Sequence, residues 1–559
     1  MNGTALRKRT LWALGAALAI LWLGAFPLLL LRWDGPGLLD WTLRYSYSGF
    51  TQTKRDTAWL LGGVTALCSL PLLLCGAAKA KGLLSPGRLL LVACFGWMAL
   101  SMCFGSAREI AGNSGGLAVW EGGNRYEGMS TQLCYLCIFL VCSLLSVHEG
   151  MAGLGAALGL TGFAVIVALQ YLGGDPLDLY PGTRSILTNY EFQGTIGNID
   201  MCAGYLALVT PLLLGITAVR GGKVGWALLP FGLVGVLLVL MMEVTAGELA
   251  LGFGLMLLLL LMLSRPETRS RGCVILAGVA LCVLLRSVTG LPWLDGLNEP
   301  WNCVPRTDAP ELPSLTGTEQ LIFPWQVTSK KLLLVPVILL LLAAAWGLRK
   351  HPGRRVPLKP VLLTLGGLGL AAVLVLWLAP IPANAGILGQ IHEVLCGRGS
   401  DSMGSERLGV WRHTLHIARD NLLFGTGPDT FLTVMQRHLA AEGATLNQTF
   451  DNPHNLLLAI LVQNGLPAML LYIAGIAAIA YRCLKKRTGL PYLAAALCYL
   501  VQGMFTFSIV IVTPMFWAVL GLAAGSGDAL SVAAATAPPK GEPGELPQSL
   551  RDSSLEEGA

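Results

Sequence analysis

Long apolar segments recur along the whole chain, and short polar stretches separate them. An apolar run of about 18 residues or more can cross the hydrocarbon core of a bilayer as an α-helix. The pattern therefore predicts an all-α, polytopic membrane helical bundle with about fourteen spans, or about twelve if 224–264 and 491–526 divide differently. The predicted spans are 11–31, 58–76, 89–106, 129–147, 151–171, 201–219, 224–241, 248–264, 272–287, 332–347, 360–380, 454–481, 491–507 and 511–526.

Positively charged residues gather in alternate connections between these spans. Cytoplasmic loops of membrane proteins carry an excess of Lys and Arg. If the N-terminus is cytoplasmic, every basic cluster falls on the cytoplasmic side. These clusters lie at 7–9, 79–88, 220–223, 265–271, 349–359 and 482–487. The formal net charge of +6 is therefore a topology signal, and no nucleic-acid partner is expected.

Composition agrees with a membrane protein. Hydrophobic residues make up 54% of the chain and charged residues 13%, with a mean hydropathy of +0.64, whereas soluble domains carry about 25% charged residues. The first apolar run, of about 21 residues, exceeds the usual 7–15 of a signal peptide, and no clear cleavage site follows it. We expect it to be a retained anchor.

The polar parts of the chain are divided unequally between the two sides. The longest outward connection is 381–453, and loops held on a rigid scaffold often carry function. The C-terminal 527–559 is rich in Pro, Gly, Ser and Glu, which predicts a disordered cytoplasmic tail. The predicted organisation is thus a membrane domain over 1–526 with an extracytoplasmic catalytic loop over 381–453.

Two stretches of the 381–453 loop have the apolar spacing of amphipathic helices. In the first, Leu408, Trp411 and Leu415 recur at helical intervals, and Ser405 is placed to cap its start. The second covers about 428–441. We expect both helices to lie over the membrane mouth. The polar face of the first helix presents Arg407, Arg412, His413, His416 and Arg419.

Histidine and cysteine raise the question of a metal site. His413 and His416, with His438 and His454, could in principle share an ion, but no carboxylate or Cys partner falls at a convincing spacing. Cys134-x-x-Cys137 has no second pair to complete a zinc site, so we expect no metal. Two outward cysteines, Cys303 and Cys396, could pair in an oxidising compartment.

A polar group, Asp451-Asn452-Pro453-His454-Asn455, stands at the start of a predicted span. Asp451 or Asn452 is suited to cap the helix. His454 is suited to accept a proton, since an imidazole with a pKa of about 6.5 is largely neutral at neutral pH. Pro453 disfavours helix at Asn452, and the positive end of the helix dipole should lower the imidazole pKa.

Four stretches, in one order, resemble the O-antigen ligase and Wzy-type O-antigen polymerase superfamily. The resemblance covers about 120–520. Asp200, Asn421 and the 245–248 sequence TAGE depart from the family pattern, which affects substrate details more than membership. The four stretches are NRYEGMSTQLCYL (124–136), GTIGNIDMCAGYLALVTPLLLG (194–215), SERLGVWRHTLHIARDNLLFGTGPDTF (405–431) and PHNLLLAILVQNGLPAMLLY (453–472).

The resemblance implies a glycosyltransferase on the outer face of a bacterial plasma (inner) membrane. Its donor would be a glycan on polyprenyl pyrophosphate, in contact with membrane lipids, and its acceptor a glycan, a lipid or a protein; no cofactor is implied. Arginine suits the leaving pyrophosphate because its planar fork binds two oxygens. The expected catalytic residues are His454, Arg407 and Arg125, and the expected substrate-binding residues are Arg184, Arg412, Asn455 and Asn198.

Two readings from other functional classes remain open at this point. A lipid-linked glycan flippase would line a central cavity with intramembrane Arg or Lys, which are scarce in the predicted spans. A non-enzymatic scaffold of a surface-polymer machine would leave His454 without a task. For the arginines of the predicted donor site, the alternative to pyrophosphate binding is that they only contact lipid headgroups.

Overall fold

The structure is a computed structural model that describes residues 13–34, 41–43, 49–74, 85–112, 115–144, 149–171, 177, 179, 193–289, 334–350, 358–382 and 386–534. Within these residues a helix occupies each predicted span. Seven helices are long and apolar enough to cross a membrane, and shorter apolar helices accompany them. The chain is therefore a helical, multi-pass membrane protein. The helices of the bundle are Ala13–Ala25 (ending in the π-helical turn η1, Leu21–Ala25), α2 (Phe50–Leu74), α4 (Pro86–Phe104), α6 (Met129–Leu144), α7 (Glu149–Tyr171), α8 (Ile199–Arg220), α9 (Gly222–Met242), α10 (Thr245–Ser264), α11 (Pro266–Thr289), α14 (Leu334–Lys350), α15 (Leu358–Leu378), α19 (Leu456–Lys486), α20 (Leu490–Gly503) and α21 (Thr513–Ala534).

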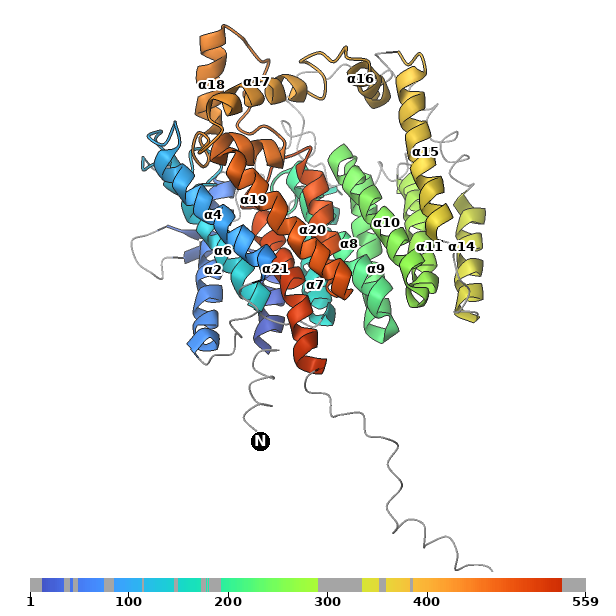
Figure 1. Cartoon of the computed structure of the whole chain (residues 1–559). Helices are drawn as coiled ribbons and strands as arrows, with labels where there is room; N and C mark the ends of the chain where they lie inside the picture. Colours follow the sequence, from blue (N-terminus) through green and yellow to red (C-terminus); the bar gives the residue numbers. More distant parts are fainter. Residues whose placement is uncertain are drawn as a thin grey trace, which may run out of the picture.

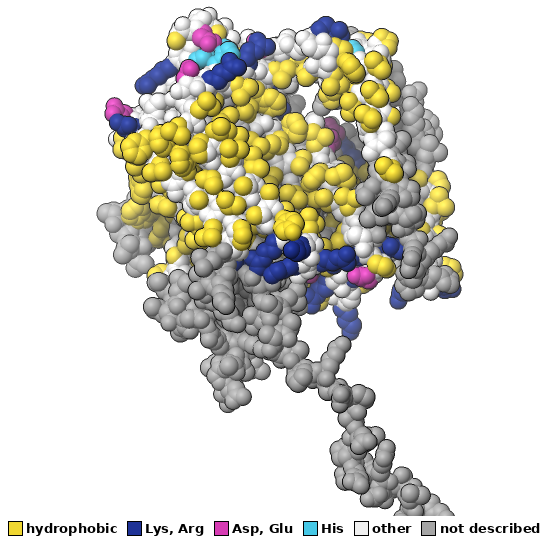
Figure 2. All heavy atoms as spheres, in the orientation of Figure 1, with side chains coloured by type: hydrophobic (Ala, Val, Ile, Leu, Met, Phe, Trp, Pro, Cys, Tyr) yellow, Lys and Arg dark blue, Asp and Glu magenta, His cyan; other side chains and the backbone are white. Residues whose placement is uncertain are grey.

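The bundle helices run roughly side by side, and shorter helices lie across one end of the bundle (Figure 1). These are α16 (Gly386–Leu395), α17 (Arg407–Asp420) and α18 (Phe431–Glu442). A single turn of helix, α5 (Ala118–Glu121), precedes α6 in the chain. A belt of hydrophobic side chains covers the middle of the molecule; Lys and Arg gather at its lower edge, and at the upper end they are mixed with Asp, Glu and His (Figure 2). The 381–453 segment and the basic edge thus lie at opposite ends.

Helix α8 lies at the centre of the bundle. In its most apolar window 94% of the residues are buried, against 33–50% in the other candidate spans. A helix that is hydrophobic on all sides is stable only where neighbours cover every side. Helices α7, α9, α10 and α20 provide that cover. The outer end of α8 is thereby fixed relative to the loops around it.

Three predicted boundaries differ from the structure. The outward segment 32–57 contains a short antiparallel hairpin of β1 (Leu31–Trp33) and β2 (Trp41–Leu43), and α2 begins at Phe50, before the predicted 58. Helix α20 has 14 residues, about 21 Å at 1.5 Å per residue, and is too short to span the bilayer core of about 30 Å. Helix α21 continues to Ala534, past the predicted end at 526.

The two amphipathic helices predicted in the 381–453 loop are present as α17 and α18. Their apolar sides pack together through Val410, Ile417, Phe431 and Met435, over Val462 of α19. They therefore rest on the protein itself. The predicted cap is wrong: the residue before α17 is Glu406, in the left-handed conformation, and no side chain caps the helix.

A break in α19 provides a docking place for the loop that precedes α18. The backbone at Gly465 is non-helical, with φ +81° and ψ 170°. A Cβ there would lie 2.1 Å from the carbonyl oxygen of Leu423, so only glycine fits. The loop 422–427 pairs with the break, and the Leu466 N–H donates to the Leu422 carbonyl at 2.8 Å. Two of the stretches that carried the family resemblance therefore pack into each other.

Candidate active site

Non-helical segments from distant parts of the chain meet at the C-terminal end of α4 and the N-terminal ends of α6 and α19. Together with side chains of α4, α6, α19 and α21 they line a cavity of about 80 Å³, and neither His454 nor Arg407 is among the lining residues. A cavity of this size holds several waters and is too small for a glycan. Larger substrates therefore require the more exposed side of the same site. The segments are 122–128, 426–430, 450–455 and 504–512.

Arg125 and Asp451 form an ion pair across this site. The Nε of Arg125 donates to one Asp451 oxygen at 2.6 Å, and a terminal guanidinium nitrogen lies 2.5 Å from the same oxygen. The side-chain amide of Asn124 donates to that oxygen at 2.9 Å. The expectation that Asp451 caps the following helix is therefore wrong, since its carboxylate holds a side chain 326 residues away.

His454 lies in a tight turn just before α19, with φ +51°. Its backbone N–H donates to the side-chain oxygen of Asn452 at 3.1 Å, and its ring nitrogen Nδ1 lies 3.0 Å from the backbone carbonyl of Asn452. A carbonyl only accepts, so Nδ1 carries the proton in the neutral ring and Nε2 is the available base. Burial lowers the pKa of His454, although the bond to Asn452 opposes this. The expected direction is confirmed, and the main cause is burial.

One aromatic ring brings the predicted acid–base and arginine residues together. The Arg125 guanidinium lies 5.2 Å from the ring centre of Phe507, and the His454 ring centre lies 5.0 Å from it. Phe450 packs on His454 from another side at 5.6 Å. Phe507 belongs to the irregular segment between α20 and α21, so this segment contributes to the site.

Arg407 is the first residue of α17, and its positive charge also lowers the pKa of His454. In the described part of the chain no carboxylate pairs with its guanidinium. On the same helix, the indole N–H of Trp411 donates to the Pro453 carbonyl at 2.8 Å. This bond fixes α17 against the turn that holds His454.

Both asparagines that were predicted to bind substrate are helix caps. Asn455 accepts from the Leu458 N–H at 3.1 Å, so it is the cap of α19 that Asp451 and Asn452 were expected to be. Asn198 caps α8 by accepting from the N–H groups of Asp200 at 2.9 Å and Met201 at 3.3 Å.

The other two predicted substrate-binding residues are arginines outside this group. Arg412 is exposed and donates to Asp401 at 3.0 Å. Arg184 lies outside the described residues. The geometry therefore adds nothing to either assignment.

Asp429 is a site residue that the sequence interpretation did not select. One of its carboxylate oxygens accepts the backbone N–H groups of Asn124 at 3.2 Å, Arg125 at 3.0 Å and Glu127 at 3.1 Å. Burial raises its pKa to about 6, although these three bonds oppose the rise. Asp429 therefore holds the loop that presents Arg125. Asp429 follows Pro428 in the stretch 405–431 that resembles the family, and its place in that stretch could have identified it as a site residue.

Glu127 was also missed. The Tyr135 hydroxyl donates to one of its oxygens at 2.7 Å, and the Gln132 amide lies 3.1 Å from the other. Burial raises the pKa of this carboxyl to about 8. It is the acidic residue of the R-x-E-G motif in the first resemblance stretch, and it lines the cavity beside Arg125.

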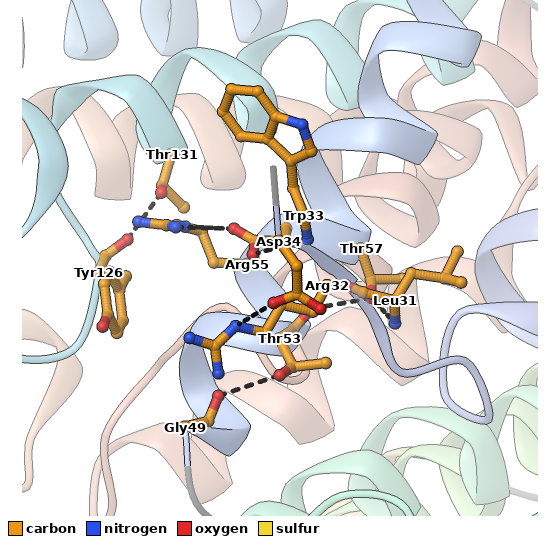
Figure 3. Close-up of polar contacts among 11 residues, drawn as sticks. Leu31, Arg32, Trp33, Asp34, Gly49, Thr53, Arg55, Thr57, Tyr126 and Thr131 are labelled. Atoms are coloured by element: carbon orange, nitrogen blue, oxygen red, sulfur yellow. Dashed lines mark hydrogen bonds and ion pairs between the residues drawn. The ribbon is translucent and has the colours of Figure 1, made fainter. Parts of the chain in front are cut away.

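A buried arginine on α2 supports the loop that carries Arg125. Arg55 donates to Asp56 at 2.9 and 2.7 Å and lies 4.7 Å from the Trp59 ring and 4.5 Å from the Tyr126 ring. Figure 3 shows Arg55 beside Tyr126 and the strand β1. The sequence interpretation placed this arginine in an outer loop. The predicted helix began at residue 58, whereas α2 begins at Phe50 and therefore includes Arg55.

Three of the outward histidines form a separate cluster on α17 and α18. His413, His416 and His438 surround Glu442, which lies one helical turn after His438. The expectation that no carboxylate has a suitable position is therefore wrong. His392 is on α16 and contacts Cys396. The suggested disulfide partner Cys303 lies outside the described residues.

Comparison with known families gives one match that bears on this site. Residues 322–473 match the model of a family described as O-antigen ligase. The match covers about a quarter of the chain, which is similar to O-antigen ligases over these residues. This region includes Arg407 and His454, and it supports the resemblance to an O-antigen ligase-type membrane protein. None of the curated proteins compared with the chain matches it. Arg125 lies outside the matched region, so its place in the site rests on the contacts with Asp451 and Phe507.

Proposed function

We propose that the protein is a membrane oligosaccharide transferase of the O-antigen ligase or polymerase type. It moves a glycan from polyprenyl pyrophosphate to an acceptor hydroxyl on a glycan, a lipid or a protein. One observation supports this most directly: a half-buried imidazole with a lowered pKa, whose Nδ1 lies 3.0 Å from the Asn452 carbonyl, packs on the same Phe507 ring as the Arg125 guanidinium. The O-antigen ligase match to the region around it points to the same class.

In the proposed reaction His454 is the base. The acceptor oxygen bonds to the anomeric carbon of the donor sugar while the bond from that carbon to the pyrophosphate oxygen breaks. The hydroxyl proton passes to Nε2 of His454, and the electron pair leaves with polyprenyl pyrophosphate. This requires a neutral imidazole, which the burial of His454 favours.

The arginines stabilise the leaving group in this proposal. Arg407, which has no carboxylate partner in the described part of the chain, is available to phosphate oxygens. Arg125 exchanges part of its contact with Asp451 for the pyrophosphate. Charge that develops on the bridging oxygen is stabilised most by donors that are already in place. The ion pair with Asp451 holds Arg125 in place before the donor arrives.

The site lies at the α16–α18 end of the bundle, opposite the basic edge (Figures 1 and 2). By the distribution of positive charge this end faces away from the cytoplasm. The proposal therefore places the reaction on the outer face of a bacterial plasma membrane, where the lipid-linked donor reaches the site from the bilayer.

Transfer by the purified full-length protein in detergent tests the proposal. A lipid-linked glycan is the donor, and candidate acceptors are offered one at a time. The wild type should transfer to one acceptor class. His454→Ala should lose about 10²–10⁴-fold in rate, as expected for loss of a general base, and His454→Gln should be nearly as slow.

A matched control is His392→Gln, which changes a histidine of the same outward segment on α16. It should transfer at the wild-type rate. Near-normal transfer by His454→Gln would show that the residue positions substrate without accepting the proton. No transfer by the wild type to any acceptor class would contradict the proposed activity itself.

A further inference from the structure

A cluster of possible metal ligands lies on the outward helices, apart from the proposed transfer site. We propose that His413, His416, His438 and Glu442 bind one zinc ion, which joins α17 to α18. Nothing in the proposed transfer reaction uses these four side chains. The inference is independent of that reaction, because it rests on the geometry of the cluster alone.

With one Glu442 oxygen as ligand, the distances from His438 to His413 and to Glu442, and from Glu442 to His416, are close to those of a tetrahedral zinc ion, and all four ligand atoms lie within 4.8 Å of one another. Zinc binds imidazole nitrogen and carboxylate oxygen at about 2.0–2.2 Å, so the ligands of a regular tetrahedron lie about 3.3–3.6 Å apart. His413 Nδ1 lies 3.2 Å from His438 Nε2 and 3.2 Å from one Glu442 oxygen. The other Glu442 oxygen lies 3.3 Å from His438 Nε2 and 3.7 Å from His416 Nδ1.

Two helical intervals and one packed interface produce this geometry. His413 and His416 are three residues apart on α17, and His438 and Glu442 are four apart on α18, so each pair shares a helix face. The apolar packing of Val410 against α18 brings the two faces together. All four ligand atoms lie within 4.8 Å of one another.

The ligand types select a transition metal over the hard divalent cations. Imidazole suits zinc, whereas Mg²⁺ and Ca²⁺ prefer six or more oxygen ligands. Four protein ligands also complete the tetrahedron, which is the pattern of a structural zinc site. The His413 and His438 side chains are 12% and 17% exposed, while Glu442 is 40% exposed. The site is therefore covered on one side and open to an entering ion on the other.

The cluster is visible on the surface of the molecule. Histidine side chains gather beside acidic ones over α17 and α18, at the upper left of Figure 2. The same α17 carries Trp411, which bonds to the turn of His454. A zinc ion here would fix α17 to α18 and so support the helix that covers the proposed transfer site.

Metal content and stability of the full-length protein test the site. The protein is purified in detergent with an affinity tag that contains no histidine, stripped with a chelator, and given Zn²⁺ or Co²⁺. We expect one zinc per chain, a higher melting temperature with zinc, and the visible absorption of tetrahedral cobalt. An excess of Mg²⁺ or Ca²⁺ should not displace the ion.

Variants locate the ion. The His413→Ala/His438→Ala pair and Glu442→Gln should weaken zinc binding by more than the roughly 10–100-fold typical for loss of an outer-shell partner. His392→Ala is the matched control and should keep the full metal content. Wild-type protein without bound zinc, or an octahedral cobalt spectrum, would overturn the site. Unchanged zinc content in the variants would also overturn it.

The wild-type measurements keep the test decisive even if a variant fails to fold. Stripped and zinc-loaded wild type are compared directly, so a missing rise in melting temperature together with a missing cobalt spectrum contradicts the proposal. None of these readouts depends on glycan transfer. Failure of the zinc site and failure of the proposed transfer reaction are therefore distinguishable.

Discussion

At the scale of single residues, the turn at 451–455 shows how a local conformation selects a chemical form. His454 occupies the left-handed region, which costs about 1–3 kcal/mol for a residue with a side chain. Two bonds to Asn452 offset that cost and also determine which ring nitrogen carries the proton. The strained turn thereby leaves Nε2 as the unprotonated nitrogen of a ring that packs on Phe507, as the Arg125 guanidinium also does.

The pH dependence of transfer follows from the lowered pKa of His454. Only the neutral ring accepts a proton, and burial moves its pKa below the usual 6.5. The decline in transfer rate at saturating donor as pH falls should therefore be centred below about 6.5. Rate–pH profiles of the wild type and His454→Gln measure this. A decline centred above pH 7, or the same decline in the Gln variant, would contradict the assignment.

Arginine geometry at the donor site gives a second residue-scale prediction. Arg125→Lys and Arg407→Lys keep the charge but lose the planar fork that binds two phosphate oxygens. Each should lower the transfer rate by about 10-fold or more, equivalent to roughly 1.4 kcal/mol. Arg419→Lys, on the exposed side of α17, serves as the control. Full transfer by both Lys variants at normal expression would favour headgroup anchoring.

At the scale of elements, the break in α19 determines where the outward loops rest. The loop 422–427 bonds to the backbone that the break leaves without helical partners, and the Ser101 hydroxyl of α4 donates to the Phe424 carbonyl at 2.5 Å and lies 2.9 Å from the Gln463 carbonyl. Asp429 continues from this loop and holds the segment of Arg125. Gly465 thus supports the loop 422–427 directly and, through Asp429, the segment that carries Arg125.

Replacing the glycine at the break tests this role. Gly465→Ala places a Cβ 2.1 Å from the Leu423 carbonyl oxygen at φ +81°, which should destabilise the fold by at least about 1–3 kcal/mol. Gly252→Ala is the control, because a Cβ there meets nothing within 4 Å and alanine favours helix by up to about 1 kcal/mol. Thermal unfolding in detergent compares them. Equal melting temperatures for Gly465→Ala and wild type would contradict the role of the break.

At the scale of the whole molecule, charge and shape agree on one orientation. The basic residues at the end of α19 lie on the edge opposite α16–α18 (Figure 2). Helix α8 is buried on all sides at the centre, and the polar segments of the candidate site meet at the end of the bundle near α17 and α18. We infer that this end faces outward and that substrates approach it from the outer leaflet.

Cysteine labelling tests the orientation. Thr445→Cys, at an exposed outward position, should react with an impermeant thiol reagent in intact cells, whereas Lys485→Cys at the basic end of α19 should react only after permeabilisation. The background carries Cys103→Ser, Cys303→Ser and Cys396→Ser, because Cys103 is an exposed native thiol and the other two are predicted to lie in outward segments. Protection of position 445 together with labelling of position 485 in intact cells would reverse the orientation.

The sequence by itself determined the positions of the apolar helices and of the amphipathic α17 and α18, and it gave His454 and Arg407 as candidates, whereas the number of helices that span the membrane does not follow from it. These follow from periodicity and from short motifs, which are properties of neighbouring residues. Tertiary structure alone decided that Asp451 pairs with Arg125, that Asn455 caps α19, and that Glu442 joins three histidines. Each of these depends on where helices pack or on how a turn bends. Spacing along the chain does not encode a contact between residues 326 positions apart.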